Sequence, residues 1–327
     1  MKRIFTILFI LTIDCIFARS AFAQNLDSVF SWGYQLQNPI PSEIAAAPFD
    51  LVVIDYSSDG TDVTAFTTEE LTQMKSSGKK IIAYLSIGET EDYRFYFKEK
   101  WTKQKTGEPC NTKNTSNAPA WLSDANEDFC GNYKTRYWMK KWQNIIFGNT
   151  SGPKKSYLDR IIDAGFDGIY LDIIDAFEYQ PFIDELGGER KAAKLMAKFV
   201  IALSSYARNS RARSDFIVIP QNGAGILDLL PNKLRLQYLN AIDGIGAEDT
   251  FYFGELDEDN EFDPQSVTIT NIAKFVTAGK KVFSIDYLLD NTKIADYQTR
   301  ACENSFIPQV SNRELDSLDF HLLDGCS

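Results

Sequence analysis

Two acidic residues stand at matching positions in two similar segments of the chain. One segment reads Asp167-Gly-Ile-Tyr-Leu-Asp172 and the other reads Asp243-Gly-Ile-Gly-Ala-Glu248. Because side chains alternate along a β-strand, the last acid of each segment faces away from the apolar residue before it. Two such carboxyls, one protonated and one ionised, are what hydrolysis of a glycosidic bond requires. We therefore predict Asp172 and Glu248 as a catalytic pair.

Other residues restrict the chemistry further. The chain has a single histidine, His321, close to its C-terminus, and it lacks the motifs G-x-S-x-G, H-E-x-x-H and a phosphate-binding glycine loop. Acid–base work must then come from Asp, Glu or Tyr, and we expect no cofactor. The alternative for strand-end acids is that they cap helices or form ion pairs.

More polar and aromatic residues follow the ends of the predicted strands. The acids could hold a divalent metal or the amines of a cationic sugar, and we expect no metal site. Aromatic rings pack against sugar faces and attract cationic amines, although rings also fill cores. The residues predicted to bind substrate are Trp32, Tyr34, Asp55, Tyr84, Glu89, Asp175, Asn222, Tyr252, Asp286 and Tyr287.

Short β-branched or aromatic runs alternate with helical segments along the chain, which indicates parallel strands joined by crossovers. The helices are expected at about 68–78, 188–208, 231–241 and 268–278. The strands are expected at 29–36, 51–54, 80–87, 168–171, 216–219, 242–247, 281–285 and 305–310. This pattern predicts an α/β fold, a (β/α)8 TIM barrel in which strand ends carry the active site.

In such a barrel the two acids come from strands four and six. Two strand spacings place their Cα atoms roughly 10 Å apart, and inward carboxyls can then approach to about 5–9 Å. That range covers both retaining and inverting glycosidases, so the stereochemical outcome stays open.

Residues from about 98 to 150 interrupt the alternation and hold Cys110, Cys130 and four of the five tryptophans. We interpret this segment as an insertion after strand three that lies over the barrel mouth. Four cysteines beyond residue 23 allow two disulfides. The simplest pairing joins Cys110 to Cys130 and Cys302 to Cys326.

The N-terminus has the pattern of a secretory signal peptide. Lys2 and Arg3 precede an apolar stretch, and Ala21-Phe22-Ala23 fits a cleavage site after Ala23. Cleavage would leave one domain, 24–327, and change the net charge from −11 to −13. Such an acidic chain disfavours nucleic acid and anionic membranes and favours cationic partners. We expect a secreted or periplasmic monomer that binds neither nucleic acid nor membranes.

The chain resembles the endo-α-1,4-polygalactosaminidase family, family 114 of the glycoside hydrolases. The resemblance rests on W-G-Y-Q-L from Trp32, on L-V-V-I-D-Y from Leu51, on I-A-Y-L-S-I-G-E-T-E from Ile82, and on segments 165–177, 221–223, 246–252 and 306–318. It implies cleavage of α-1,4-linked galactosamine polymers. It also implies Asp172 as nucleophile or base and Glu248 as acid/base.

Two other functions remain open from the sequence. The barrel could bind carbohydrate without catalysis, which loss of one acid would have favoured. It could also be a metal-dependent hydrolase that uses Asp172 and Asp175, and activity in the presence of EDTA would disfavour that function.

Overall fold

The computed structural model describes residues 26–104, 111–113, 116–318 and 326. Among these residues eight parallel strands follow one another around a barrel, and each overlaps a strand expected from the sequence. They are β1 (Trp32–Gln35), β2 (Leu51–Ile54), β3 (Lys80–Ser86), β9 (Gly168–Asp172), β10 (Ile217–Pro220), β11 (Gly244–Glu248), β12 (Lys281–Tyr287) and β13 (Ile307–Ser311). The predicted TIM-barrel class is confirmed.

The strand ladder is continuous from β1 to β10 and from β11 to β13, and two seams join these sheets. At the first seam the backbone N–H of Asn222 donates to the carbonyl of Gly246 at 2.9 Å. At the second seam the indole N–H of Trp32 donates to the carbonyl of Ile307 at 3.0 Å. The seams place β10 beside β11 and β13 beside β1, so the strands surround one axis.

Two apolar cores lie on the two sides of the strands. Ile169 and Leu171 of β9 belong to the outer core, which packs against the helices. Tyr170, between them, belongs to the inner core that fills the barrel. This alternation, the one expected from the sequence, leaves the next residue, Asp172, on the inner side. The inner core comprises Leu26, Val29, Trp32, Tyr34, Leu51, Val53, Ile82, Tyr84, Tyr170, Ile217, Ile219, Phe283, Ile285, Tyr287, Ile307 and Leu315.

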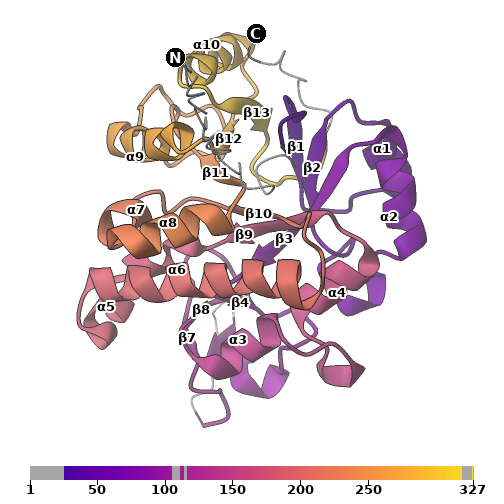
Figure 1. Cartoon of the computed structure of the whole chain (residues 1–327), viewed down its shortest axis with the longest axis vertical. Helices are drawn as coiled ribbons and strands as arrows, with labels where there is room; N and C mark the ends of the chain where they lie inside the picture. Colours follow the sequence, from indigo (N-terminus) through magenta and orange to yellow (C-terminus); the bar gives the residue numbers. More distant parts are fainter. Residues whose placement is uncertain (1–25, 105–110, 114–115, 319–325, 327) are drawn as a thin grey trace, which may run out of the picture.

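Helices cover the outside of the strands, with α6 running across the front in Figure 1. The four predicted helices correspond to α2 with the turn after it, α6, α8 and α9, whereas α1, α4, α5, α7 and α10 were not predicted. The helices are α1 (Pro41–Ala46), α2 (Thr68–Met74), α3 (Lys140–Ile146), α4 (Tyr157–Ala164), α5 (Gln180–Leu186), α6 (Glu189–Ser205), α7 (Ile226–Leu229), α8 (Asn232–Ala241), α9 (Ser266–Thr277) and α10 (Asn291–Glu303).

The start of α2 illustrates how the sequence sets these boundaries. The Thr67 hydroxyl accepts the backbone N–H of Glu70 at 3.2 Å, and the Glu70 carboxylate accepts the N–H of Thr67 at 2.8 Å. This capping box satisfies two N–H groups that the first helical turn leaves without partners.

The insertion after β3 forms a small antiparallel unit. Its sheet has the order β4-β8-β7, and β5 pairs with β6 beside it. In Figure 1, β4, β7, β8 and α3 lie at the lower end of the view, beyond α6. Trp121 contacts Trp101 and Trp142 with ring centroids 5.3 and 5.0 Å apart, so these rings pack a core. The strands are β4 (Glu89–Glu91), β5 (Thr102–Gln104), β6 (Asn111–Lys113), β7 (Leu122–Ala125) and β8 (Asn132–Thr135).

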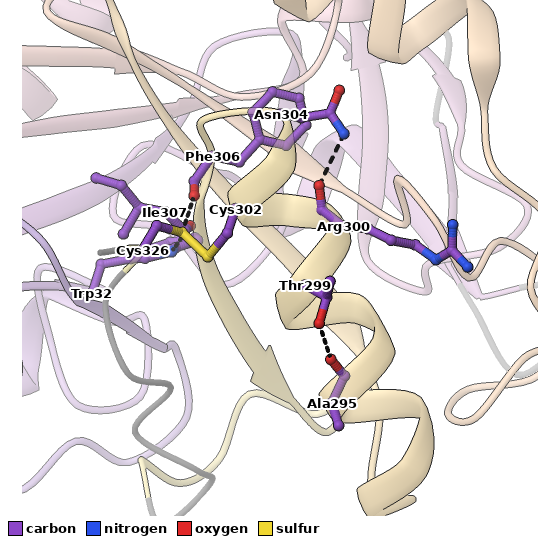
Figure 2. Close-up of a disulfide and its surroundings, with 9 residues drawn as sticks. All are labelled: Trp32, Ala295, Thr299, Arg300, Cys302, Asn304, Phe306, Ile307 and Cys326. Carbon is purple, nitrogen blue, oxygen red and sulfur yellow. Dashed lines mark hydrogen bonds between the residues drawn. A yellow bond between two sulfur atoms is a disulfide. The ribbon is translucent and has the colours of Figure 1, made fainter.

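One predicted disulfide is present, between Cys302 at the end of α10 and Cys326 (Figure 2). The Cys326 sulfur also lies 3.1 Å from the carbonyl oxygen of Phe306. Cys130 is disulfide-bonded as well. Its predicted partner Cys110 lies outside the described residues, so that pairing stays a prediction.

Removal of the Cys302–Cys326 bond should destabilise the protein. The bond closes a loop over a sequence separation of 24 residues. Restricting the unfolded chain in this way contributes roughly 2–4 kcal/mol. We expect the double variant Cys302→Ala/Cys326→Ala to lose about that much free energy of unfolding in urea titrations. An unchanged midpoint would contradict the expectation.

Candidate active site

Asp172 and Glu248 lie at the carboxyl ends of β9 and β11, half-buried and on the inner side of the barrel. The residue after each acid has a left-handed backbone, with φ of 56° at Ile173 and 49° at Asp249. These turns end both strands directly after the acid. The two carboxyl side chains are thereby left at the barrel mouth, where TIM-barrel enzymes carry out their chemistry.

Each carboxyl accepts a hydrogen bond from a tyrosine on the neighbouring strand. The Tyr84 hydroxyl donates to Asp172 at 2.6 Å, and the backbone N–H of Ile173 donates to the other oxygen of Asp172 at 2.7 Å. The Tyr287 hydroxyl donates to Glu248. Tyr84 reaches Asp172 from β3, and Tyr287 reaches Glu248 from β12. These hydrogen bonds fix the orientation of the two acids.

The loop after β10 adds a further contact to Glu248. The Asn222 side-chain amide donates to the Glu248 carboxylate at 3.1 Å, and its oxygen accepts the Glu248 backbone N–H at 3.2 Å. The neighbouring Gln221 side chain also hydrogen-bonds to Glu248. The sequence prediction included Asn222 but missed Gln221, although adjacent polar residues at a strand end were a usable signal.

The environment raises the pKa of both acids. Burial raises the pKa of Asp172 to about 8, and the charge of Glu248 adds to the rise. Burial also raises the pKa of Glu248, while hydrogen bonds from Tyr287 and Asn222 oppose that rise. Two coupled carboxyls with raised pKa values retain a proton near neutral pH. The pair can therefore supply one acid and one base.

Tyr34 and Tyr170 lie close to the pair on the inner side. Burial first, and then the charges of Glu248 and Asp172, raise the pKa of both tyrosines well above the usual value. Both hydroxyls therefore stay protonated. The Tyr170 hydroxyl is buried and has no hydrogen-bond partner among the described residues.

Gly246 makes room for Tyr170. A Cβ atom at Gly246 would lie 1.9 Å from the Tyr170 hydroxyl oxygen, and that ring is enclosed. We expect Gly246→Ala to lower the free energy of unfolding by about 1–3 kcal/mol, as overpacked cores do. Gly225→Ala is a matched control, because its nearest contact would be 3.6 Å. Equal thermal stability of the two variants would contradict this account.

More charged side chains surround Asp175, which lies within the turn after β9. Burial raises the pKa of Asp175, an effect that the nearby Lys134 ammonium opposes. Burial, with the charge of Asp175, also raises the pKa of Glu178 to about 7. The sequence prediction missed Glu178 and Lys134, and for Lys134 no local signal existed because it arrives on the inserted strand β8.

Several predicted substrate-binding residues are instead occupied by contacts within the protein. Asp55 is buried and pairs with the buried Arg94 at 2.7 Å. Glu89 is buried and pairs with Lys134 at 2.5 Å. Trp32 is fully buried in the inner core. We do not retain these three residues in the site.

Asp286 and Tyr252 also serve the fold. The Asp286 carboxylate has no exposed surface and accepts the backbone N–H groups of residues 250–252 at 2.8–2.9 Å. The Tyr252 hydroxyl donates to Asp296 at 2.7 Å. Together these contacts fix the loop after β11. Of the predicted set, the structure brings Tyr34, Tyr84, Asn222 and Tyr287 to the two acids, with Asp175 next to them.

Among the described residues no group of three or more His, Cys, Asp or Glu side chains is arranged to hold a metal ion. The same part of the chain contains no helix with the length and apolar character needed to span a membrane.

A TIM barrel with two inward carboxyls at its strand ends has the architecture of a glycoside hydrolase. The chain belongs to the glycoside-hydrolase family GH114, whose sequence pattern matches residues 18–324. The family inferred from the sequence is thereby confirmed, and with it the class of glycoside hydrolases.

Related chains occur in several organisms. An uncharacterised protein of Methanocaldococcus jannaschii is 38% identical over 314 residues, which cover 91% of this chain and 82% of the relative. An uncharacterised protein of Thermotoga maritima is 33% identical over 338 residues, 99% of this chain and 95% of the relative. Among solved structures, the glycoside hydrolase domain of PelA from Pseudomonas aeruginosa is similar with a TM-score of 0.57. It is 17% identical, covers 88% of this chain and 96% of its own, and supports the fold.

Proposed function

We propose that the protein is a secreted hydrolase that cleaves α-1,4-linked galactosamine-containing polysaccharide with Asp172 and Glu248. The observation that carries the proposal is the carboxyl pair itself. Each acid faces the barrel mouth, accepts a tyrosine hydroxyl and has a raised pKa. Such a pair can donate a proton to the leaving oxygen with one member and stabilise or attack the anomeric carbon with the other.

Glu248 acts as acid/base and Asp172 as nucleophile or base in this proposal. In the free protein, burial favours the proton on Asp172, whose pKa is raised to about 8. A protonated sugar amine bound beside Asp172 and Asp175 would favour the ionised form of Asp172. The proton of the pair would then reside on Glu248, where it is needed for the leaving group.

The charge at the barrel mouth supports the proposed substrate class. The charge of Asp175 acts on Asp172, and burial raises the pKa values of both Asp175 and Glu178, so the ionised form of each is disfavoured unless a positive charge lies nearby. A cationic amino sugar supplies the missing positive charge. The net charge of −11 also attracts a cationic polymer at long range.

Export is part of the proposal. The pattern of residues 1–23 and the Cys302–Cys326 disulfide both suit an oxidising compartment outside the cytoplasm. We propose that the protein works there as a monomer without cofactor or metal.

The direct test uses the purified protein with two polymers, de-acetylated and N-acetylated α-1,4-linked galactosamine chains. We expect soluble oligosaccharides from the de-acetylated polymer, measured as new reducing ends and by mass spectrometry, with the same rate in EDTA. Binding without new reducing ends would support a carbohydrate-binding protein instead. Loss of activity in EDTA would support a metal-dependent hydrolase.

A further inference from the structure

Arg313 makes two strong contacts just beyond the end of β13. Its guanidinium donates to both oxygens of Asp249, at 2.8 and 3.0 Å. Its central carbon lies 3.7 Å from the centroid of the Tyr287 ring. The backbone N–H of Arg313 donates to the Glu258 carboxylate at 2.9 Å, which fixes the backbone from which the side chain extends.

Both partners of the Arg313 side chain lead directly to Glu248. Asp249 follows Glu248 in the chain and has a left-handed backbone with φ of 49°, a conformation that a non-glycine residue keeps only when its surroundings hold it. Tyr287 donates its hydroxyl to the Glu248 carboxylate. Arg313 thus holds both the residue that sets the direction of the Glu248 side chain and the residue that binds its carboxylate.

We propose that Arg313 is a positioning residue that acts through Asp249 and Tyr287 to fix the orientation and the charge environment of Glu248. The proposal rests on the proposed function, because it assigns a partner to the acid of that function. A planar guanidinium is suited to this task, since it can bind a carboxylate with two N–H groups and stack on a ring at the same time.

The groups that face Glu248 come from six parts of the barrel. Arg313 contributes a positive charge to this set and Asp249 a negative one, and the two lie in direct contact. Removing one member of that ion pair therefore leaves the charge of the other acting on Glu248. The groups are Tyr34 of β1, Tyr170 and Asp172 of β9, Gln221 and Asn222 after β10, Asp249 after β11, and Tyr287 of β12 with Arg313 against it.

Variants of the two members of the Arg313–Asp249 ion pair should shift the pKa of Glu248 in opposite directions. Arg313→Gln leaves the Asp249 carboxylate unpaired near Glu248, which raises the pKa of Glu248 and moves its limb of the pH–rate profile to higher pH. Asp249→Asn leaves the guanidinium unpaired and moves the same limb to lower pH. The double variant should return toward the parent profile.

The kinetic effect should appear in kcat. We expect Arg313→Gln to lower kcat about 10-fold with KM changed less than about 3-fold, because a misplaced acid affects the transition state more than binding. Arg313→Lys should recover part of the lost rate, since lysine keeps the positive charge but lacks the planar guanidinium that donates two hydrogen bonds to one carboxylate. Arg300→Gln is the matched control, because Arg300 also stacks on a ring, that of Phe262 at 4.0 Å, and pairs with Asp296 at 2.6 Å.

Equal profiles for Arg313→Gln and Arg300→Gln would overturn the inference, as would shifts of the same sign for Arg313→Gln and Asp249→Asn. If Glu248→Gln keeps full activity, the proposed function fails, and that result is distinct from either of these. A second readout needs no substrate: the side-chain carboxyl of Glu248 is titrated by NMR in protein labelled with ¹³C-glutamate and assigned with Glu248→Gln. Opposite shifts of its pKa in the two variants are expected there too.

Discussion

Asp172→Asn and Glu248→Gln are each expected to lower turnover at least about 100-fold, which is the usual contribution of a general acid or base. Both changes keep the shape of the side chain and remove its ability to ionise. Initial rates of reducing-end release from the de-acetylated polymer measure the effect. Near-normal activity in both variants would show that the reaction does not use this pair.

Unfolding experiments separate this loss from misfolding. Burial raises the pKa of folded Asp172 to about 8, whereas an unfolded aspartate titrates near 3.9. The stability of the fold therefore falls progressively as the pH rises from the unfolded to the folded pKa, because Asp172 loses its proton more readily in the unfolded chain. The Asp172→Asn variant lacks this cost, so it should be at least as stable as the parent above pH 8. A lower thermal midpoint of the variant there would contradict the assigned burial.

The two variants should also differ in a way that identifies their roles. A substrate with a good leaving group, such as an aryl glycoside, needs little help from a general acid. It should therefore recover much of the rate lost by Glu248→Gln and little of that lost by Asp172→Asn. The reverse pattern would exchange the roles of the two acids.

The sequence was sufficient to predict the strands and the position of the two acids at their ends. The D-G-I-x-x-[D/E] segments both became barrel strands, and their final acids both lie on the inner side. The alternation of side chains between the two faces of a strand is a strong signal in a barrel, because each strand packs one face on an apolar interior and the other on helices. The same signal applied to β12 excludes Asp286, since Ile285 and Tyr287 on either side of it belong to the inner core.

The partners of strand-end acids could not be predicted from the sequence. Asp55 follows β2 and Asp172 ends β9, so the two acids look alike in sequence. Asp55 forms an ion pair with Arg94, which comes from the insertion after β3, whereas among the described residues Asp172 accepts a tyrosine hydroxyl and a backbone N–H and has no cationic partner. Contacts between distant segments thus decide which acid supports the fold and which remains at the barrel mouth without a cationic partner among the described residues.

Arg94→Met is expected to lower the free energy of unfolding by about 3–5 kcal/mol, because it leaves buried carboxylates without a counter-charge. The Arg94 side chain has no exposed surface and pairs with Asp55 and with Glu91, both at 2.7 Å. Rings surround it, with Tyr93 nearest at 4.7 Å between the guanidinium carbon and the ring centroid. Water cannot replace the lost charge in such a site. Urea titrations of the parent and the variant measure the difference.

A matched control distinguishes burial from charge alone. Arg136 pairs with Glu185 at 2.7 Å, but both side chains are partly exposed, so Arg136→Met should cost less than about 1 kcal/mol. Adding Asp55→Asn and Glu91→Gln to Arg94→Met should restore part of the lost stability, since it removes the uncompensated charges. Equal losses for Arg94→Met and Arg136→Met would contradict the role of burial.

The stability lost in Arg94→Met should depend on pH with a defined sign. Burial raises the pKa of Asp55 even in the parent, and Arg94 opposes that rise. Without Arg94 the folded-state pKa of Asp55 rises further above its unfolded value of about 3.9. A carboxyl of this kind destabilises the fold fully above its folded pKa, and the loss shrinks as the pH falls from that value toward the unfolded pKa. The deficit relative to the parent should therefore be full above the raised pKa of the variant and shrink as the pH falls from there toward the folded pKa of the parent, whereas a deficit caused only by lost packing would stay constant.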